Sequence, residues 1–346
     1  MSSLGDSLAY LSIVQALQRL YPDWKVHACV SEFAAGLFQA VLPASQLLVA
    51  DRDEFHSAWK HPLRLRRLLR RVREWQAQAA LLGDDQPNTA YLLARLAGGA
   101  TRVGPVRDFI KVPDALTHEV AWRTGQGIPL WNWEMARMFA RVTGGEELPV
   151  SPPVPSIDGL EPLPLAARRG VVIHPGAGKA YQRWDAHRFA ELARRLAVDH
   201  DVIWFDQEFT ADVRLPRSVE RLTPRSLQFL LELLCRARLF VGNNSGPMHV
   251  AAMAACPSII LNGPSHPVWD PMWNTERISM LRAANVACQP CDPPACPVGV
   301  CANTREPMAC LNAWSAREVF ARCENWMEHH CSGGMVLPSR ETAAPA

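Results

Sequence analysis

The alternation of strands and helices is clearest where the chain reads Gly170-Val171-Val172-Ile173-His174-Pro175-Gly176-Ala177-Gly178-Lys179. A β-branched run ends at His174, a turn with two glycines follows, and apolar residues then recur at helical spacing over 189–196. Backbone N–H groups of such a strand–turn–helix unit can hold phosphate, and Lys179 adds a point charge. The alternative is an ordinary turn whose Trp184 packs the helix.

The same alternation continues along the second half of the chain. Further strands are predicted at 202–205, 239–241 and 258–261, and further helices at 226–235 and 248–255. This pattern predicts an α/β fold with a parallel sheet covered on both faces, in which ligands bind at the carboxyl ends of the strands.

The first half shows a similar but noisier pattern. Helices are predicted at about 8–20, 62–75 and 89–97, and a strand at about 24–30. An α/β domain should open with a strand, yet this chain opens in the turn before its first helix. We therefore expect either a start upstream of Met1 or a first sheet that lacks a strand.

A proline-rich segment divides the chain almost in half. Six prolines lie between Glu147 and Pro164, where neither a helix interior nor a central strand can accept them. The predicted boundaries are an N-terminal domain at 1–148, a linker at 149–167, a C-terminal domain at 168–330 and a disordered tail at 331–346.

Composition excludes several classes of protein. The 346 residues carry a net charge of +2 and include no apolar run of the length that spans a membrane, which argues against a transmembrane protein, a disordered chain and a general nucleic-acid binder. The N-terminus lacks the features of a signal peptide, so the expected location is the cytoplasm.

A second strand–turn–helix unit reads Gly242-Asn243-Asn244-Ser245-Gly246-Pro247-Met248-His249. Asn244 or Ser245 can cap a helix that begins near Pro247. Two turns of the phosphate-binding type in one domain suggest a nucleotide diphosphate across the strand ends. His249 by itself is more often a helix residue than a ligand contact.

Three segments together resemble the heptosyltransferases of glycosyltransferase family 9, which extend the inner core of lipopolysaccharide. They are HPGAGK…RW at 174–184, GNNSGPMH at 242–249 with Gly263-Pro264-Ser265 after it, and SSLGD at 2–6. The resemblance covers nearly the whole chain. It implies a GT-B architecture, in which two Rossmann-like domains face a cleft, and an inverting reaction without a catalytic metal or other cofactor.

The resemblance also implies residue roles. Asp6 matches the proposed general base, although by its position alone it would cap a helix that begins at Ser7 or Leu8. Lys179 and the backbone amides of Ser245 and Gly246 would bind the departing diphosphate. The expected donor-binding set is His174, Gly176, Gly178, Lys179, Glu208, Asn244, Ser245, Gly246 and His249. Asn244 stands where the family commonly has aspartate, which removes a negative charge.

A strongly basic helix is predicted over 62–75. A solvated basic face above a buried leucine stripe explains it, but its arginines could also hold an anionic lipid-linked acceptor at a membrane surface. The residues assigned to acceptor binding are Arg64, Arg66, Arg67 and Arg70.

Seven of the ten cysteines lie between 288 and 331. Four thiolates can close a tetrahedral zinc or iron site, whereas reduced or packed cysteines are the alternative. The set that best matches the family's cluster is Cys288, Cys291, Cys296 and Cys310.

These features predict an enzyme that transfers heptose from ADP-heptose to a lipopolysaccharide inner-core acceptor, in the cytoplasm or peripherally at the inner membrane. One alternative is the same fold with a protein acceptor of the autotransporter type, or with another nucleotide sugar. The other is a non-catalytic subunit that binds a nucleotide sugar.

Overall fold

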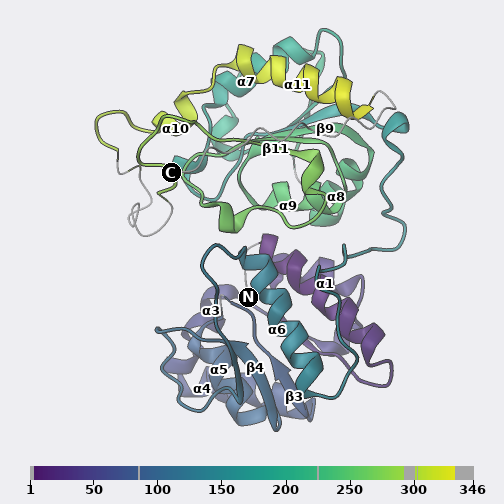
Figure 1. The fold of residues 1–346 in the computed structure, drawn as a ribbon, viewed down its shortest axis with the longest axis vertical. Coiled ribbons are helices and arrows are strands. Elements are labelled where there is room, and N and C mark those ends of the chain that lie inside the picture. The colour runs from purple at the N-terminus through teal and green to yellow at the C-terminus, as the bar shows by residue number, and fades with distance from the viewer. Residues whose placement is uncertain (1–3, 85, 224–225, 292–300, 302, 332–346) are drawn as a thin grey trace.

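The computed structural model describes residues 4–84, 86–223, 226–291, 301 and 303–331 (Figure 1). The C-terminal half contains a six-stranded, all-parallel sheet with the strand order β11-β10-β9-β6-β7-β8. The bounds of its strands are β6 Arg169–His174, β7 Val202–Phe205, β8 Val219–Leu222, β9 Ala237–Asn243, β10 Ser258–Leu261 and β11 Ile278–Leu281.

Helices cover both faces of this sheet. Figure 1 shows α7 and α11 on the face remote from the N-terminal half, and α8 and α9 on the face toward it. Their bounds are α7 Ala186–Leu196, α8 Leu227–Arg236, α9 Gly246–Met253, α10 Ala309–Asn312 and α11 Ala316–Cys331. The β-branched and aromatic strand residues are buried on both sides, as a parallel sheet between two helix layers requires.

The N-terminal half contains two separate parallel sheets. β1 (Ala28–Ser31) pairs with β2 (Leu47–Ala50), and β3 (Ala79–Leu81) pairs with β4 (Thr101–Pro105), which in turn pairs with β5 (His118–Val120). The helices are α1 Leu4–Leu20, α2 Glu32–Gln39, α3 Arg52–Ser57, α4 Pro62–Glu74, α5 Asn88–Ala97 and α6 Ile128–Val142. Among the described strands none joins β1 to β3.

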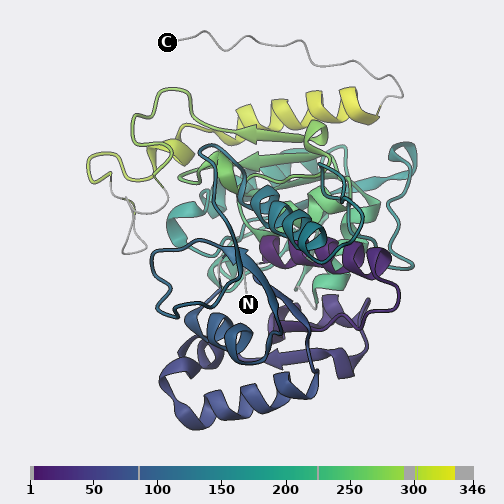
Figure 2. The same cartoon turned by 60° about the horizontal axis from the view of Figure 1, so that its bottom comes forward.

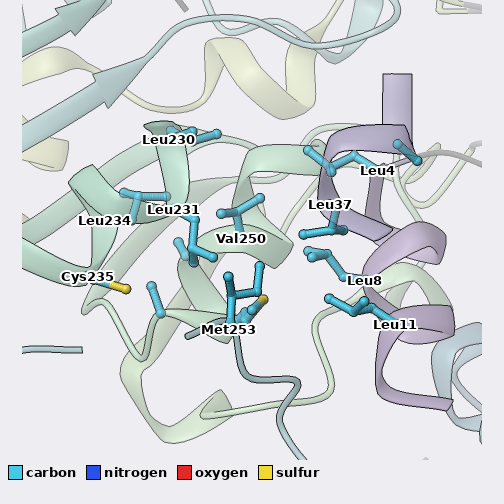
Figure 3. Close-up of a cluster of buried hydrophobic side chains, with 14 of the residues drawn as sticks. Leu4, Leu8, Leu11, Leu37, Leu230, Leu231, Leu234, Cys235, Val250 and Met253 are labelled. Carbon is cyan, nitrogen blue, oxygen red and sulfur yellow. The ribbon is translucent and has the colours of Figure 1, made fainter. Parts of the chain in front are cut away.

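Helix α1 packs against the C-terminal half. Leu4, Leu8 and Leu11 lie on one face of α1 and belong to the same buried cluster as Val250 and Met253 of α9 (Figure 3). The spacing of the three leucines places them along one side of the helix. One apolar core therefore crosses from one half of the chain to the other.

The proline-rich segment at 149–167 accepts hydrogen bonds from side chains of both halves of the chain. Its only helical turn among the described elements is a 3₁₀ turn at Leu165–Ala167. The Ser12 hydroxyl donates to the carbonyl of Pro153 at 2.6 Å, and the Trp273 indole N–H donates to the carbonyl of Pro152 at 3.2 Å. The segment is thus bonded to both halves of the chain.

Several predicted elements differ from those observed. The first helix begins at Leu4 and not near Leu8, so Asp6 lies inside its first turn. Strand β8 escapes prediction because its central residues, Glu220 and Arg221, are exposed and break the apolar run. The predicted tail at 331–346 lies, apart from Cys331, outside the described residues. Among the described helices, none has the length and hydropathy needed to cross a bilayer.

Candidate functional site

The C-terminal sheet changes direction of winding between β6 and β9. From β6 the chain moves to β7 and β8 on one side, and it then returns to form β9 on the other side of β6. His174 at the end of β6 lies in register with Gly242 near the end of β9. A crevice outside the carboxyl ends at such a point is where open α/β sheets bind ligands.

One asparagine ties together the two turns that follow these strands. The Asn243 Nδ2 donates to the carbonyl of Pro175 at 2.7 Å, and its Oδ1 accepts from the backbone N–H of Trp184 at 2.8 Å. The Ser245 hydroxyl adds a longer bond to the carbonyl of Gly176, at 3.4 Å. The two sequence motifs are therefore parts of one site.

Asn243 was not among the predicted site residues. Its signal in the sequence is a carboxamide at the end of the buried run Leu239-Phe240-Val241-Gly242, where a fully buried polar group needs partners. The predicted set contains Asn244, which stands at a position where the family commonly has aspartate. It is also buried, but its side-chain Nδ2 has no hydrogen-bond partner.

The two glycines of the first turn have different environments. A Cβ atom on Gly176 would lie 2.7 Å from the His174 ring and 2.8 Å from the Gln207 Oε1, so packing requires glycine there. A Cβ atom on Gly178 would meet no atom within 4 Å. Packing does not explain Gly178, and open space in front of a backbone segment is what a close-lying ligand needs.

Lys179 follows this turn directly. Its ammonium lies 5.5 Å from the centroid of the Tyr181 ring, a cation–π distance. The Gln182 amide donates to the Ser265 hydroxyl at 3.2 Å, which brings the Gly263-Pro264-Ser265 segment to the same edge of the sheet. The first two of the three segments that carry the family resemblance, with Gly263-Pro264-Ser265 as part of the second, therefore meet here.

Buried polar atoms without a hydrogen-bond partner also gather at this edge. Among the described residues they include His174 Nδ1, Asn244 Nδ2, both side-chain polar atoms of Asn262, and Gln289 Oε1. Asn262 follows β10, next to β9, and the Gln289 Nε2 donates to its carbonyl at 2.9 Å. Such groups are costly when unpaired, and a polar ligand would give them partners.

Two histidines of the site are electrically neutral. Burial lowers the pKa of His174 to about 4 and the pKa of His249 to about 4, because an imidazolium would lose its hydration there. They can take part in hydrogen bonds near neutral pH without adding charge.

The start of α1 reaches this site from the N-terminal half. A Cβ atom on Gly5 would lie 2.6 Å from the His249 ring, and a Cβ atom on Gly246 would lie 2.7 Å from the Leu4 Cβ. These two close approaches bring the first turn of α1, with the buried carboxylate of Asp6, beside the first turn of α9. The reading of Asp6 as the cap of a helix that begins at Ser7 or Leu8 is wrong, because the helix begins at Leu4.

A second polar cluster lies on the N-terminal side and was also missed by the sequence analysis. Asp84 accepts from the Tyr10 hydroxyl at 3.0 Å and from the Asn132 Nδ2 at 2.8 Å, and its other oxygen lies 3.6 Å from the Arg107 guanidinium. Arg107 in turn lies over the Trp131 ring. The sequence Gly-Asp-Asp at 83–85 matches no motif that predicts this cluster.

The arginines predicted to bind the acceptor do not lie at the edge of the C-terminal sheet where β6 and β9 end. Arg64, Arg66, Arg67 and Arg70 lie on α4, which both views place at the end of the N-terminal half remote from the C-terminal half (Figures 1 and 2). Leu63 at the start of this helix is 82% exposed. These arginines are therefore separated from Asp6 and Lys179.

The predicted donor-binding residue Glu208 lies at the same edge of the sheet. It begins a 3₁₀ turn, Glu208–Thr210, that follows β7.

The structure describes three of the four cysteines predicted to bind a metal. Cys310 is buried, and its pKa is raised to about 11 by burial and by the nearby thiols of Cys301 and Cys288. Cys291 is half-buried, and Cys296 lies outside the described residues. Within the described part of the chain, no three potential ligands come together as a metal site, so the predicted cysteine set stays a prediction.

Comparison with known proteins agrees with this arrangement. Residues 154–300 match the sequence model of glycosyltransferase family 9 (heptosyltransferase), which confirms the predicted resemblance over these residues. A curated relative, lipooligosaccharide heptosyltransferase 2 of Campylobacter jejuni, is 29% identical over 151 residues, or 39% of this chain and 47% of the relative. The matching region thus spans about half the length of that relative.

Solved structures share the fold over nearly the whole chain. The E. coli heptosyltransferase WaaC with ADP has a TM-score of 0.67 at 18% identity, covering 94% of this chain and 98% of its own. The E. coli ADP-heptose lipopolysaccharide heptosyltransferase II has a TM-score of 0.69 at 18% identity, with coverage of 94% and 96%. The iron-containing dodecameric glycosyltransferase TibC of E. coli has a TM-score of 0.54 at 17% identity, with coverage of 94% and 74%. The predicted GT-B architecture is confirmed.

Proposed function

We propose that this chain is a glycosyltransferase of family 9 that transfers heptose from ADP-heptose to an inner-core lipopolysaccharide acceptor. The observation that carries the proposal is the edge of the C-terminal sheet at β6 and β9, where the segments of the family match meet around unpaired buried polar groups. The names of the relatives and of the solved structures support heptose as the sugar and ADP as the nucleotide.

On the donor side, the turn after β6 and the start of α9 receive the diphosphate. The N–H groups in the first turn of α9 and the positive end of its dipole stabilise negative charge, and Lys179 adds a full positive charge. Because His174 and His249 are neutral, the lysine is the charged partner among these three side chains. Negative charge grows on the diphosphate as the bond to the sugar breaks, so these groups act most strongly in the transition state.

On the acceptor side, Asp6 is the proposed general base. The acceptor hydroxyl oxygen attacks the anomeric carbon from the face opposite the diphosphate, its proton passes to the Asp6 carboxylate, and ADP departs. This displacement inverts the anomeric configuration. The contact of Gly5 with the His249 ring supports the role, because it puts the first turn of α1 next to the proposed diphosphate site.

The arginines of α4 serve a different part of the acceptor in this proposal. Their distance from Asp6 argues against contact with the reacting hydroxyl, whereas a charged and exposed helix suits an anionic lipid surface. The enzyme would then work in the cytoplasm at the inner membrane, where its lipid-linked acceptor lies. No catalytic step is assigned to a metal.

The test is a calorimetric titration with ADP and ADP-heptose, followed by a transfer assay on a deacylated lipopolysaccharide acceptor. ADP-heptose binding together with release of ADP into solution and a heptosylated product is expected. Binding without transfer to this acceptor would contradict the assigned acceptor, and a protein acceptor of the autotransporter type would be assayed next. Failure to bind ADP-heptose would contradict the proposed donor.

The Asp6→Ala variant tests the general base. We expect transfer to fall by at least about 100-fold, the usual range for a positioned general base, while the Kd for ADP changes little. The Lys179→Ala variant is the matched comparison, because it should weaken both ADP binding and transfer. Equal transfer rates in Asp6→Ala and the parent chain would exclude the assignment.

A further inference from the structure

The segment that follows β10 is buried, and its own polar side chain does not hold it in place. Residues 262–265 are all buried. The backbone N–H of Asn262 donates to the carbonyl of Leu281 at 3.0 Å, but both side-chain polar atoms of Asn262 are without a hydrogen-bond partner. The buried carbonyl groups of this segment therefore need donors from another part of the chain.

Gln289 supplies two of these donors. Its Nε2 donates to the carbonyl of Asn262 at 2.9 Å and to the carbonyl of Gly263 at 2.6 Å. The backbone N–H of Cys291 donates to the carbonyl of Pro264 at 3.0 Å. Three consecutive carbonyls after β10 thus accept hydrogen bonds from one short, cysteine-bearing segment.

A second cysteine-bearing segment contacts the same backbone. A Cβ atom on Gly263 would lie 2.9 Å from the Leu311 Cγ, so Leu311, next to Cys310, packs directly on this glycine. Burial is the main cause of the raised pKa of Cys310, and the thiol of Cys288, next to Gln289, contributes to it, which places the two segments close together. Gly263 is therefore in contact with both of them.

The segment after β10 is joined in turn to the turn that carries Lys179. The buried Ser265 hydroxyl accepts from the Gln182 Nε2 at 3.2 Å. Gln182 ends the 3₁₀ turn Ala180–Gln182, and its backbone N–H donates to the carbonyl of Lys179 at 3.0 Å. Hydrogen bonds and a few peptide bonds thus connect Gln289 to the backbone of Lys179.

We infer that Gln289 is a positioning residue of the donor site. It fixes residues 262–265 and, through Ser265 and Gln182, the turn that presents Lys179 to the diphosphate. Gln289 acts through these residues and is assigned no contact with the donor. Its effect on ADP binding rests on the proposed function, whereas its effect on the backbone does not.

The chemistry of the side chain explains why glutamine suits this position. A carboxamide NH₂ group has two hydrogens, so it can satisfy two carbonyls at once. Methionine has nearly the same length and no donor, and in its place the carbonyls of Asn262 and Gly263 would each lose a hydrogen bond. A less firmly held segment opens more often, and its amides exchange faster with solvent.

Hydrogen exchange of the chain without ligand tests the inference. In Gln289→Met, the amides of Gln182 and Arg183, which bond within the turn after Lys179, should exchange at least about tenfold faster. The amides of α8 should keep the parent rate. Gln228→Met, at an exposed position of α8, is the matched control and should leave the rates at Gln182 and Arg183 unchanged.

A second variant cuts the same path at another point. Ser265→Ala removes one hydroxyl, and it should accelerate exchange at Gln182 and Arg183 as Gln289→Met does. The double variant should exchange no faster than the faster single variant, because both changes break one connection. Calorimetric titration should give a Kd for ADP about tenfold higher in each single variant and in the double variant, and an unchanged Kd in Gln228→Met.

Several results would overturn the inference. They are unchanged exchange at Gln182 in Gln289→Met or in Ser265→Ala, an equal acceleration of the α8 amides, which shows a general loss of stability, and multiplied effects in the double variant. If Gln289→Met does not fold, Ser265→Ala alone decides. Faster exchange with an unchanged Kd for ADP would exclude the role in donor binding. A parent chain that does not bind ADP contradicts the proposed donor and leaves the exchange result in force.

Discussion

Asn243 joins the two turns of the site through a single carboxamide, with Pro175 and Trp184 as its backbone partners. Its neighbour Asn244 is also buried but leaves its Nδ2 without a partner. Adjacent residues of the same type therefore have different roles. Asn243 joins two backbone segments, and Asn244 remains a predicted donor-binding residue.

Replacing Asn243 with alanine tests this division. The change leaves a buried carbonyl and a buried N–H unpaired, so we expect unfolding free energy to fall by about 2 to 4 kcal/mol and ADP affinity to fall at least about tenfold. Urea denaturation and calorimetric titration measure the two effects. The matched Asn244→Ala variant should keep its stability within about 1 kcal/mol, and unchanged ADP affinity in Asn243→Ala would contradict the arrangement.

The buried histidines make stability depend on pH. The folded-state pKa of His174 and of His249 is about 4, below the unfolded value of about 6.5, so between these values the unfolded chain binds more protons. We therefore expect stability to be fully present above about pH 6.5 and to fall as pH drops toward 4. Urea midpoints measured across this range report the effect.

A histidine substitution separates this effect from general acid unfolding. His249→Gln should flatten part of the pH dependence, because the replacement does not titrate in this range. His187→Gln, at an exposed position of α7, is the matched control and should leave the curve unchanged. If His249→Gln and His187→Gln give the same curve as the parent, burial of His249 does not control acid stability.

Among the single elements, helix α4 carries a cluster of arginines at the end of the N-terminal half that is remote from Asp6 and Lys179. It buries Val72 and presents most of its arginines to solvent. Replacing Arg66, Arg67 and Arg70 with glutamine preserves helix propensity, so the fold should be kept. At about 1 kcal/mol for each charge near an anionic surface, binding to vesicles that contain anionic lipid should weaken by roughly 100-fold.

Vesicle sedimentation measures this loss, and calorimetry should find the Kd for ADP unchanged. The control replaces three exposed arginines of the C-terminal half, Arg194, Arg195 and Arg317, with glutamine. If both triple variants bind vesicles as well as the parent does, α4 is an ordinary solvated helix.

At the scale of the whole molecule, α1 connects the halves of the chain. Leu8 is 1% exposed and lies in a cluster with residues of α2, α8 and α9 (Figure 3). The segment at 149–167 is hydrogen-bonded to both sides of this contact. We expect the parent chain to unfold in one calorimetric transition, because the halves share part of their core.

Leu8→Ala removes part of that shared core. The expected cost is about 2 to 5 kcal/mol, with the single transition replaced by two, since each half keeps a core of its own. Leu96→Ala, at a position 42% exposed, should cost less than about 0.5 kcal/mol and leave one transition. Two separate transitions in the parent chain would show that the contact through α1 does not couple the halves.

Features that depend on local periodicity could be predicted from the order of the amino acids. Strand β7 and the basic helix α4 were predicted nearly to the residue, and the two strand–turn–helix motifs gave the fold of the C-terminal half and the family resemblance. Such patterns arise because an apolar period of two or of about 3.6 residues has to match one buried face.

The contacts between groups far apart in the chain could not be predicted in this way. The packing of these elements joins the two motifs through Asn243, brings the first turn of α1 to His249 and places α4 away from both. These contacts link residues tens to hundreds of positions apart, and no short-range period encodes them. They follow from how helices and sheets pack once they have formed, which is why the linear pattern predicted the elements but not their meeting points.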